Sequence, residues 1–382
     1  MGPILLATFL AIDPTLARSY LAELHAACEP ARAFWRHDLC GPVVLADPTN
    51  RAYITSDSEG TLPANIGLAN TALDWNGSKW TMILWPLPTD RNQRLALMLH
   101  ESFHRIQDSL GLPMSNPDNP HLDTLDGRYY LQLEYRALSA ALQSEGVAQR
   151  QAAADAVAFR RQRRALFPNA AAAERTLEMN EGLAEYTGVA LSGAPRRLAL
   201  LDLETGASKP SFVRSFAYAT GPAYGLLLDA YNKDWRTTLK STDDLSDLLH
   251  LEIPSNPSVD PYNGNTLRAQ EVDRDQFRQR RIASLRKLLV DGPVLVLPLQ
   301  QMSMEFNPNN LVPVDGLGTV YPTITIRDLW GSIQVTENAL LSQDFKKLTV
   351  SASGGWKLDL KPGWKIIEGK RQGDQTIASS PQ

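Results

Sequence analysis

The sequence predicts an α+β protein: a small β-sheet region, then a mostly helical lobe, then a C-terminal β domain. Three observations support this class. Short apolar runs broken by turn residues fill positions 42–88, and apolar residues at helical spacing dominate positions 89–290. After Asp291-Gly292-Pro293 the pattern changes to short strand-like segments separated by Gly, Asn and Asp. We therefore divide the chain into residues 1–88, 89–290 and 291–382.

Composition narrows the class of protein and its partners. With 382 residues, 43% hydrophobic and 21% charged, the chain is typical of a globular protein with more than one domain. A formal net charge of −4 argues against nucleic acid, or an anionic membrane surface, held by bulk charge. No run of about 18 apolar residues occurs, so we expect no membrane span.

The first 40 residues are predicted to be mainly helical, since Leu16, Leu21 and Leu24 recur at helical spacing. The apolar run Pro3–Ala11 fits either the core of an export signal or the first turns of that helix. Export (to the periplasm or outside the cell) and a cytoplasmic location are therefore both compatible with the sequence.

Cys28 and Cys40 are the only two cysteines. They fit one disulfide in an exported protein or two free thiols otherwise. Neither belongs to a CxxC motif, so a thiolate zinc site is not expected.

A small sheet is predicted from strands at 42–46, 52–55 and 80–85, each ended by turn residues. The last strand leads directly into the next helix. We expect the edge of that strand to accept an extended peptide by backbone pairing.

The helix at 90–110 contains the motif His-Glu-Ser-Phe-His at residues 100–104. Residues i and i+4 share one helical face, so His100 and His104 point the same way, a spacing that suits zinc. Glu101 on the neighbouring edge can take the proton of a zinc-activated water. The alternative is an ordinary amphipathic helix, which residues such as Leu99 and Phe103 would bury in either case.

Further helices are predicted at 125–167, 170–189, 211–230 and 266–290, with the third interrupted near Gly221-Pro222. Four arginines, Arg160, Arg161, Arg163 and Arg164, fit a solvated helix face, or alternatively a substrate-binding role. In the C-terminal region, strands are predicted at 294–297, 323–326, 332–335, 347–350 and 356–360, and residues 373–382 are expected to fray.

Two histidines leave a catalytic zinc site one protein ligand short. The metzincin solution fails, because Gln107 and Leu110 stand where that motif has Gly and the third His. The best remaining candidate is Glu181, in the segment Asn-Glu-Gly-Leu-Ala-Glu-Tyr at 180–186.

The pair of motifs HExxH and NEGxAxY resembles the gluzincin metallopeptidases, most closely their aminopeptidase-type branch. The resemblance implies a zincin-like catalytic domain and one catalytic Zn²⁺ held by His100, His104 and Glu181. It also implies that Glu101 is the general base and that Glu185 hydrogen-bonds a ligand imidazole.

A third segment, Tyr218-Ala219-Thr220-Gly221, is similar to the Y-x-x-G segment of those peptidases. The resemblance implies that Tyr218 donates to the oxyanion; Tyr186 and Tyr224 are rivals for this role. Because Glu181 follows His104 by 77 residues, the helices at 125–167 are expected to be an insertion between the ligands. The segment that binds a free N-terminus in aminopeptidases is missing, so exopeptidase specificity is not implied.

The sequence thus predicts a zinc-dependent metallopeptidase that acts on a peptide or protein substrate. The alternatives are a non-peptidase zinc amidase or esterase, and a catalytically silent zincin-fold binding protein. Neither the cleavage specificity nor the oligomeric state follows from the sequence.

Overall fold

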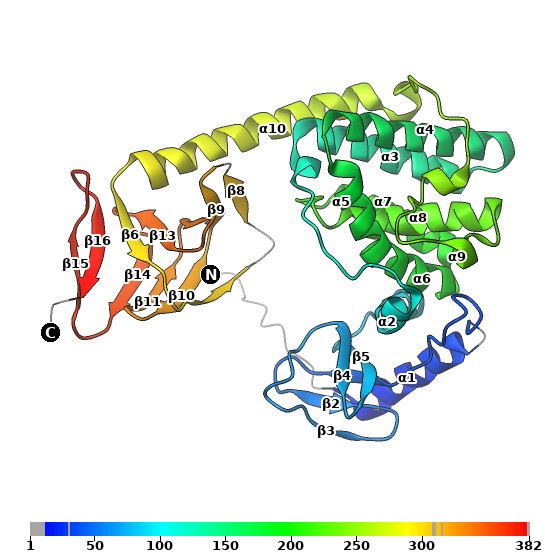
Figure 1. The fold of residues 1–382 in the computed structure, drawn as a ribbon, viewed down its shortest axis with the longest axis horizontal. Coiled ribbons are helices and arrows are strands. Elements are labelled where there is room, and N and C mark those ends of the chain that lie inside the picture. Colours follow the sequence, from blue (N-terminus) through cyan, green and yellow to red (C-terminus); the bar gives the residue numbers. More distant parts are fainter. Residues whose placement is uncertain (1–11, 30, 308–310, 315, 380–382) are drawn as a thin grey trace, which may run out of the picture. The chain divides into compact units, whose positions relative to one another are not determined.

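A computed structural model describes residues 12–379 of the chain, apart from residues 30, 308–310 and 315 (Figure 1). It confirms an α+β protein with a small N-terminal sheet, a central helical region and a C-terminal β-sheet domain. The chain forms two compact units, Met1–Ala269 and Gln270–Gln382. The apolar run Pro3–Ala11 lies outside the described residues. Among the helices described, none combines the length and the apolarity that a bilayer crossing requires.

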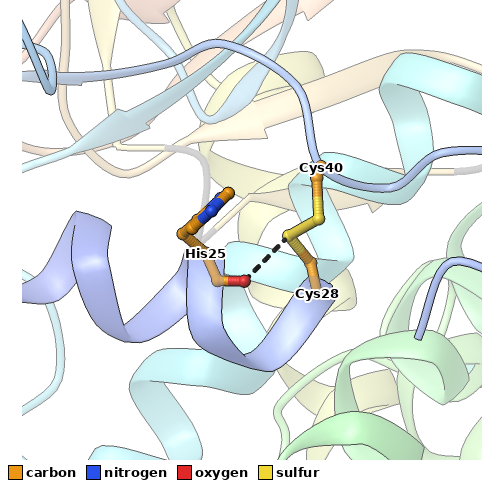
Figure 2. Close-up of side chains that lie close together, drawn as sticks. All are labelled: His25, Cys28 and Cys40. Carbon is orange, nitrogen blue, oxygen red and sulfur yellow. Dashed lines mark hydrogen bonds between the residues drawn. A yellow bond between two sulfur atoms is a disulfide. The ribbon is translucent and has the colours of Figure 1, made fainter. Parts of the chain in front are cut away.

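The first helix, α1 (Pro14–Cys28), is shorter than predicted. The Asp13 carboxylate caps its start by accepting hydrogen bonds from the backbone N–H groups of Thr15 and Leu16. Cys28, at its end, forms a disulfide with Cys40 (Figure 2). His25 lies beside this pair, but the two sulfur atoms are bonded to each other and offer no thiolate to a metal.

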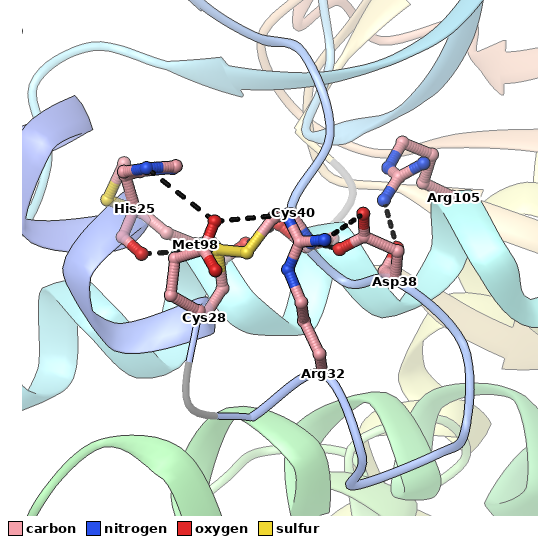
Figure 3. Close-up of a disulfide and its surroundings, with 9 residues drawn as sticks. His25, Cys28, Arg32, Asp38, Cys40, Met98 and Arg105 are labelled. Carbon is pink, nitrogen blue, oxygen red and sulfur yellow. Dashed lines mark hydrogen bonds and ion pairs between the residues drawn. A yellow bond between two sulfur atoms is a disulfide. The ribbon is translucent and has the colours of Figure 1, made fainter.

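The disulfide joins the end of α1 to the segment before β1, and both lie beside α2 (Arg91–Gln107), the helix that carries the HExxH motif (Figure 3). Met98 of α2 is fully buried and belongs to the same hydrophobic core as Cys28. Arg105 of α2 donates a hydrogen bond to the backbone carbonyl of Asp38, two residues before Cys40. Packing and a hydrogen bond therefore fix this disulfide-linked segment against the motif helix.

The N-terminal sheet has the strand order β3-β2-β1-β5-β4. The strands are β1 (Val43–Ala46), β2 (Ala52–Ile54), β3 (Glu59–Thr61), β4 (Thr71–Trp75) and β5 (Ser78–Leu84). The three predicted strands are confirmed as β1, β2 and β5. The prediction that the strand at 80–85 offers a free edge is wrong, because β5 pairs with both β1 and β4. A tight turn at Asn76 and Gly77, with φ of 50° and 74°, folds β4 onto β5, so β4 forms the edge.

The helical region follows α2. It comprises α3 (Leu125–Gln143), α4 (Gly146–Leu166), α5 (Ala170–Leu177), a π-helical turn at Glu178–Gly182, α6 (Leu183–Leu191), α7 (Pro195–Ala207), α8 (Phe216–Tyr231) and α9 (Trp235–Thr238). The predicted interruption near Gly221-Pro222 is wrong, since α8 is continuous through Pro222. A proline inside a helix costs about 3 kcal/mol. Here residues 219–225 are buried, and their packing offsets that cost.

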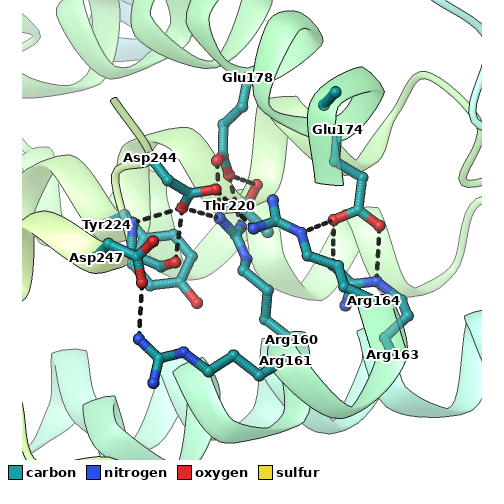
Figure 4. Close-up of polar contacts among 12 residues, drawn as sticks. Arg160, Arg161, Arg163, Arg164, Glu174, Glu178, Thr220, Tyr224, Asp244 and Asp247 are labelled. Carbon is teal, nitrogen blue, oxygen red and sulfur yellow. Dashed lines mark hydrogen bonds and ion pairs between the residues drawn. The ribbon is translucent and has the colours of Figure 1, made fainter. Parts of the chain in front are cut away.

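The arginines of α4 form a buried ionic network with carboxylates from four other segments (Figure 4). Arg160 donates to Glu134 of α3 and to both oxygens of Glu178, and Arg163 donates to Glu134 and to both oxygens of Glu174. Arg164 bridges Glu174 and Asp244. We define the buried ionic network as Arg160, Arg163, Arg164, Glu134, Glu174, Glu178 and Asp244.

The predicted solvated face is therefore wrong for three of the four arginines. Residues 160, 163 and 164 share one face of α4 because they are three and four positions apart, and this face is covered. Arg160 and Arg163 are 0% exposed, and their carboxylate partners keep these charges paired. Only Arg161 points to solvent, with its side chain 56% exposed in an ion pair with Asp247.

Replacement of Arg163 by Met should lower the free energy of unfolding by about 3–5 kcal/mol, because it leaves Glu134 and Glu174 buried with fewer cations. Arg161→Met on the same helix is the matched control and should change it by less than about 1 kcal/mol. Urea unfolding followed by circular dichroism measures both. Equal effects of the two replacements would contradict the buried network.

The C-terminal unit begins within α10 (Gly264–Arg286), which ends in a π-helical turn at Lys287–Asp291. It holds a four-stranded sheet of order β14-β11-β10-β7 and a seven-stranded sheet of order β15-β16-β6-β13-β12-β9-β8. The strands are β6 (Val294–Pro298), β7 (Ser303–Phe306), β8 (Val312–Val314), β9 (Gly318–Tyr321), β10 (Ile324–Asp328), β11 (Gly331–Val335), β12 (Ala339–Ser342), β13 (Lys347–Ser351), β14 (Trp356–Leu360), β15 (Trp364–Glu368) and β16 (Gln375–Ser379).

All five strands predicted in this region are confirmed, as β6, β10, β11, β13 and β14. The expected fraying of residues 373–382 is wrong for Gln375–Ser379. This segment pairs antiparallel with β15 and parallel with β6, and Ile377 is buried in the core between the sheets.

Candidate metal centre

Three segments far apart in the sequence meet at one cavity of the first unit. The motif helix α2 contributes His100, Glu101 and His104, the π-turn with α6 contributes Glu181 and Glu185, and α8 contributes Tyr218. All six residues singled out from the sequence line this cavity.

Two glycines permit the close helix packing that forms the site. A Cβ atom on Gly188 of α6 would lie 2.2 Å from the carbonyl oxygen of Ala96, so α6 can approach α2 only without a side chain there. A Cβ atom on Gly221 of α8 would lie 2.3 Å from the carbonyl oxygen of Gly182. Helix α6 thus packs closely against α2, and the π-turn before it packs closely against α8.

The π-turn itself carries Glu181. A π-turn adds one residue to a helical turn, and such turns occur frequently at functional sites. Glu178, its first residue, is fixed by Arg160 of the buried ionic network and by the hydroxyl of Thr220. Glu181 is only 7% exposed, so its carboxylate is committed to the cavity wall and not to solvent.

The donor atoms of His100, His104 and Glu181 lie at the spacing of a tetrahedral zinc site. The two Nε2 atoms are 3.2 Å apart, and each lies 3.6 Å from Glu181 Oε2. Zinc bound at about 2.0–2.1 Å has neighbouring ligand atoms roughly 3.3–3.4 Å apart. The three residues therefore fit one zinc ion without rearrangement of the backbone.

Hydrogen bonds on the other ring nitrogens set the histidine tautomers. His100 Nδ1 lies 2.7 Å from Glu185 Oε2, and His104 Nδ1 lies 2.7 Å from Gln107 Oε1. Since both oxygens accept, each Nδ1 carries a proton, which leaves Nε2 of each ring as the atom that a metal would bind in place of a proton. Both Nε2 atoms face Glu181, the arrangement that metal-binding histidines require.

Gln107 and Asn180 were not predicted as site residues. Gln107 is 0% exposed, and besides orienting His104 it donates to Asn180 Oδ1 at 2.9 Å. It therefore joins the motif helix to the residue just before Glu181. A position three residues after a candidate ligand on the same helical face was the pattern that would have found Gln107.

Charge and burial favour a cation between these groups. Burial lowers the pKa of His100, but hydrogen bonds with Glu181 and Glu185 outweigh this effect and raise it to about 10. Burial raises the pKa of Glu181, but hydrogen bonds from the two histidines and Tyr218 outweigh it and hold that pKa well below the usual range. The carboxylates thus stabilise positive charge at the position a divalent metal would take.

Two other acidic side chains, Glu101 and Asp202, have a raised pKa, unlike Glu181. Burial raises the pKa of Glu101, and the nearby histidines only partly offset this effect. Burial and the charge of Glu185 raise the pKa of Asp202 to about 8. Asp202 is therefore largely neutral near pH 7.

Tyr218 is the tyrosine that reaches the candidate ligands. Its hydroxyl donates to Glu181 Oε2 at 2.6 Å, and its ring stacks on His100 with centroids 5.7 Å apart. The hydroxyl of Tyr186 donates instead to Asp229, and that of Tyr224 donates to Glu134. Both rival hydroxyls are thus engaged outside the site.

The cavity has a volume of about 600 Å³. Other lining residues come from β4 and the residue before it, from α2 and the loop after it, from the π-turn and from the turn before α8: Asn70, Thr71, Ala72, Leu97, Met114, Asn116, Asn180 and Arg214. Polar groups dominate this lining, so the cavity suits a polar substrate.

No protein-family model, curated protein or solved structure matches this chain. Function is therefore argued below from its residues and their geometry.

Replacement of Glu181 by Gln should lower zinc affinity by more than about 100-fold, because it removes a proposed ligand. Glu185→Gln should lower the affinity by roughly 10- to 100-fold, because it removes the partner that orients His100. Competition with a chelating dye at neutral pH measures both. Glu204→Gln, at an exposed position of α7, is the control and should leave the affinity unchanged.

Glu174 and Glu178 are unsuitable controls because both belong to the buried ionic network. Wild-type zinc affinity in Glu181→Gln would exclude Glu181 as the third ligand.

Proposed function

We propose that this protein is a zinc-dependent metallopeptidase of the gluzincin type. The observation that carries the proposal is the set of three ligand atoms 3.2–3.6 Å apart, with the Glu101 carboxyl in the same cavity. His100, His104 and Glu181 would hold one zinc ion. A structural zinc site has four protein ligands, whereas three ligands and a cavity leave a position for water and substrate.

When bound, zinc supplies Lewis acidity, which polarises a carbonyl and makes water acidic near neutral pH. Glu101 accepts the proton of the attacking water and passes it to the leaving amine. Its burial supports this role, because a carboxylate with a raised pKa is a stronger base. Glu185 and Gln107 keep the two imidazoles in the tautomer that presents Nε2.

The edge strand β4 supports a peptide as substrate. Thr71 and Ala72 of β4 line the cavity, and among the strands described only β5 pairs with β4. An extended chain can therefore pair with the free side of β4 while a peptide bond lies at the site. A smaller amide or an ester would use the same catalytic groups but would gain nothing from this edge.

Glu101→Gln should abolish peptide hydrolysis, with a loss of at least about 10²–10⁴-fold in kcat, because the amide cannot accept the proton. Zinc stoichiometry should remain that of the wild type, since Glu101 is not a proposed ligand. Mass spectrometry of a mixed peptide library, with zinc content measured in parallel, tests both expectations.

The outcomes separate the proposal from its alternatives. Zinc-loaded wild type that leaves every peptide intact but cleaves small amides or esters would indicate an amidase or esterase. Zinc binding without any hydrolysis would indicate a binding protein with this fold. A protein that binds no zinc would contradict the proposed centre as a whole.

The role of Tyr218 can be separated into two parts. If its hydroxyl stabilises the oxyanion, Tyr218→Phe lowers kcat by roughly 10²- to 10³-fold with zinc affinity nearly unchanged. If the hydroxyl only holds Glu181, zinc affinity falls instead and kcat at saturating zinc is retained. We expect the first result; Tyr231→Phe on the same helix, outside the cavity lining, is the control.

A further inference from the structure

Arg214 stands out among the cavity residues by its charge. Among the described residues that line the cavity, it is the only Lys or Arg side chain. It precedes α8 by two residues and lies four residues before Tyr218, on the same wall as the proposed oxyanion donor. Its side chain is 56% exposed, so the guanidinium can be reached from solvent.

The nearest carboxylate leaves the guanidinium with unused donors. Arg214 Nη2 lies 3.9 Å from Glu181 Oε1, which is an ion pair but too long for a hydrogen bond. Glu181 already accepts from Tyr218, and its Oε2 faces both histidines. A zinc ion held by that carboxylate would neutralise most of the charge that Arg214 now faces.

The other two carboxylates of the cavity lining already have a hydrogen-bond partner or a proposed catalytic role. Glu185 accepts from His100 Nδ1, and Glu101 has the proposed role of base. The amides of Asn116 and Asn180 are hydrogen-bonded to each other. The guanidinium of Arg214 is therefore free to bind a planar anion from a ligand with two parallel hydrogen bonds.

We infer that Arg214 forms an anion subsite beside the metal centre and binds a substrate carboxylate. This inference rests on the proposed function and names its substrate class: peptides with a carboxylate close to the cleaved bond. That carboxylate is either an acidic side chain or the C-terminus of the peptide, since both present the same group to a guanidinium. Because Arg214 is partly exposed, the preference should be moderate, roughly 5- to 20-fold.

A binding experiment tests the subsite without relying on turnover. The zinc-loaded Glu101→Gln protein is titrated with two small zinc-binding probes, the monohydroxamate of succinic acid and the corresponding hydroxamate of succinamide. These probes differ only in a carboxylate against an amide. The carboxylate probe should bind roughly 5- to 20-fold more tightly, and adding Arg214→Gln should remove this difference while the amide probe binds as before.

Arg161→Gln is the matched control, because Arg161 is equally exposed but lies outside the cavity lining. It should leave the preference intact. Equal binding of the two probes to the zinc-loaded protein, or a preference that survives Arg214→Gln, would overturn the subsite while the metallopeptidase proposal stands. A protein that binds no zinc would overturn both.

Peptide pairs with the active protein distinguish the two sources of the carboxylate. In the first pair, one peptide has Glu and the other Gln beside the cleaved bond, and both have an amidated C-terminus. In the second pair, the two peptides share one sequence, and one has a free and the other an amidated C-terminus. The pair whose kcat/KM ratio exceeds about 5 in the wild type, and approaches 1 in Arg214→Gln, identifies the source. Arg214→Glu should invert that preference, and an unchanged ratio in both variants would overturn the subsite.

Discussion

The contact between α2 and α6 is the constraint on which the rest of the site depends. Gly188 lets the two helices touch at the carbonyl of Ala96, and this approach brings Glu181 and Glu185 over the histidines of α2. Any side chain at Gly188 would have to push the helices apart. Since the three donor atoms lie within 3.2–3.6 Å of one another, a shift of even 1 Å would move one of them out of reach of the proposed zinc ion.

The buried ionic network holds the π-turn that precedes α6. Glu178 opens the π-turn that carries Glu181, and Arg160 holds Glu178 with two hydrogen bonds. Desolvation of so many charges is costly, so such a network is a poor source of stability compared with an apolar core of the same shape. Its directional hydrogen bonds instead fix the positions of α3, α4, α5 and the π-turn relative to one another.

The sequence predicted the residues that line the cavity better than the residues that hold them in place. His100, Glu101 and His104 follow from a motif on one helix, and Glu181 from a second motif, because these residues carry their geometry in local spacing. Gln107 and Asn180 depend on how two distant segments meet, which no local pattern contains. The buried arginines were misread for the same reason: only the neighbouring helices decide whether a basic face meets solvent or carboxylates.

In the fold, long periodic segments were predicted well and short ones less so. The helices at 125–167 were found, and five C-terminal strands were placed correctly. The edge strand β4 was missed because Asp74 interrupts its apolar residues, although the Asn76-Gly77 turn indicated a hairpin. Pro222 shows the opposite error, in which a strong local preference was overruled by packing.

The 77 residues between His104 and Glu181 have a consequence for how the protein acquires its structure. A cation held by both would act as a cross-link between two segments that α3, α4 and α5 separate in the sequence. It would bind the folded chain far more tightly than the unfolded one, and at a thousandfold excess over its Kd it would add about 4 kcal/mol to stability. In this protein, supply of metal would then govern survival of the folded chain as well as its chemistry.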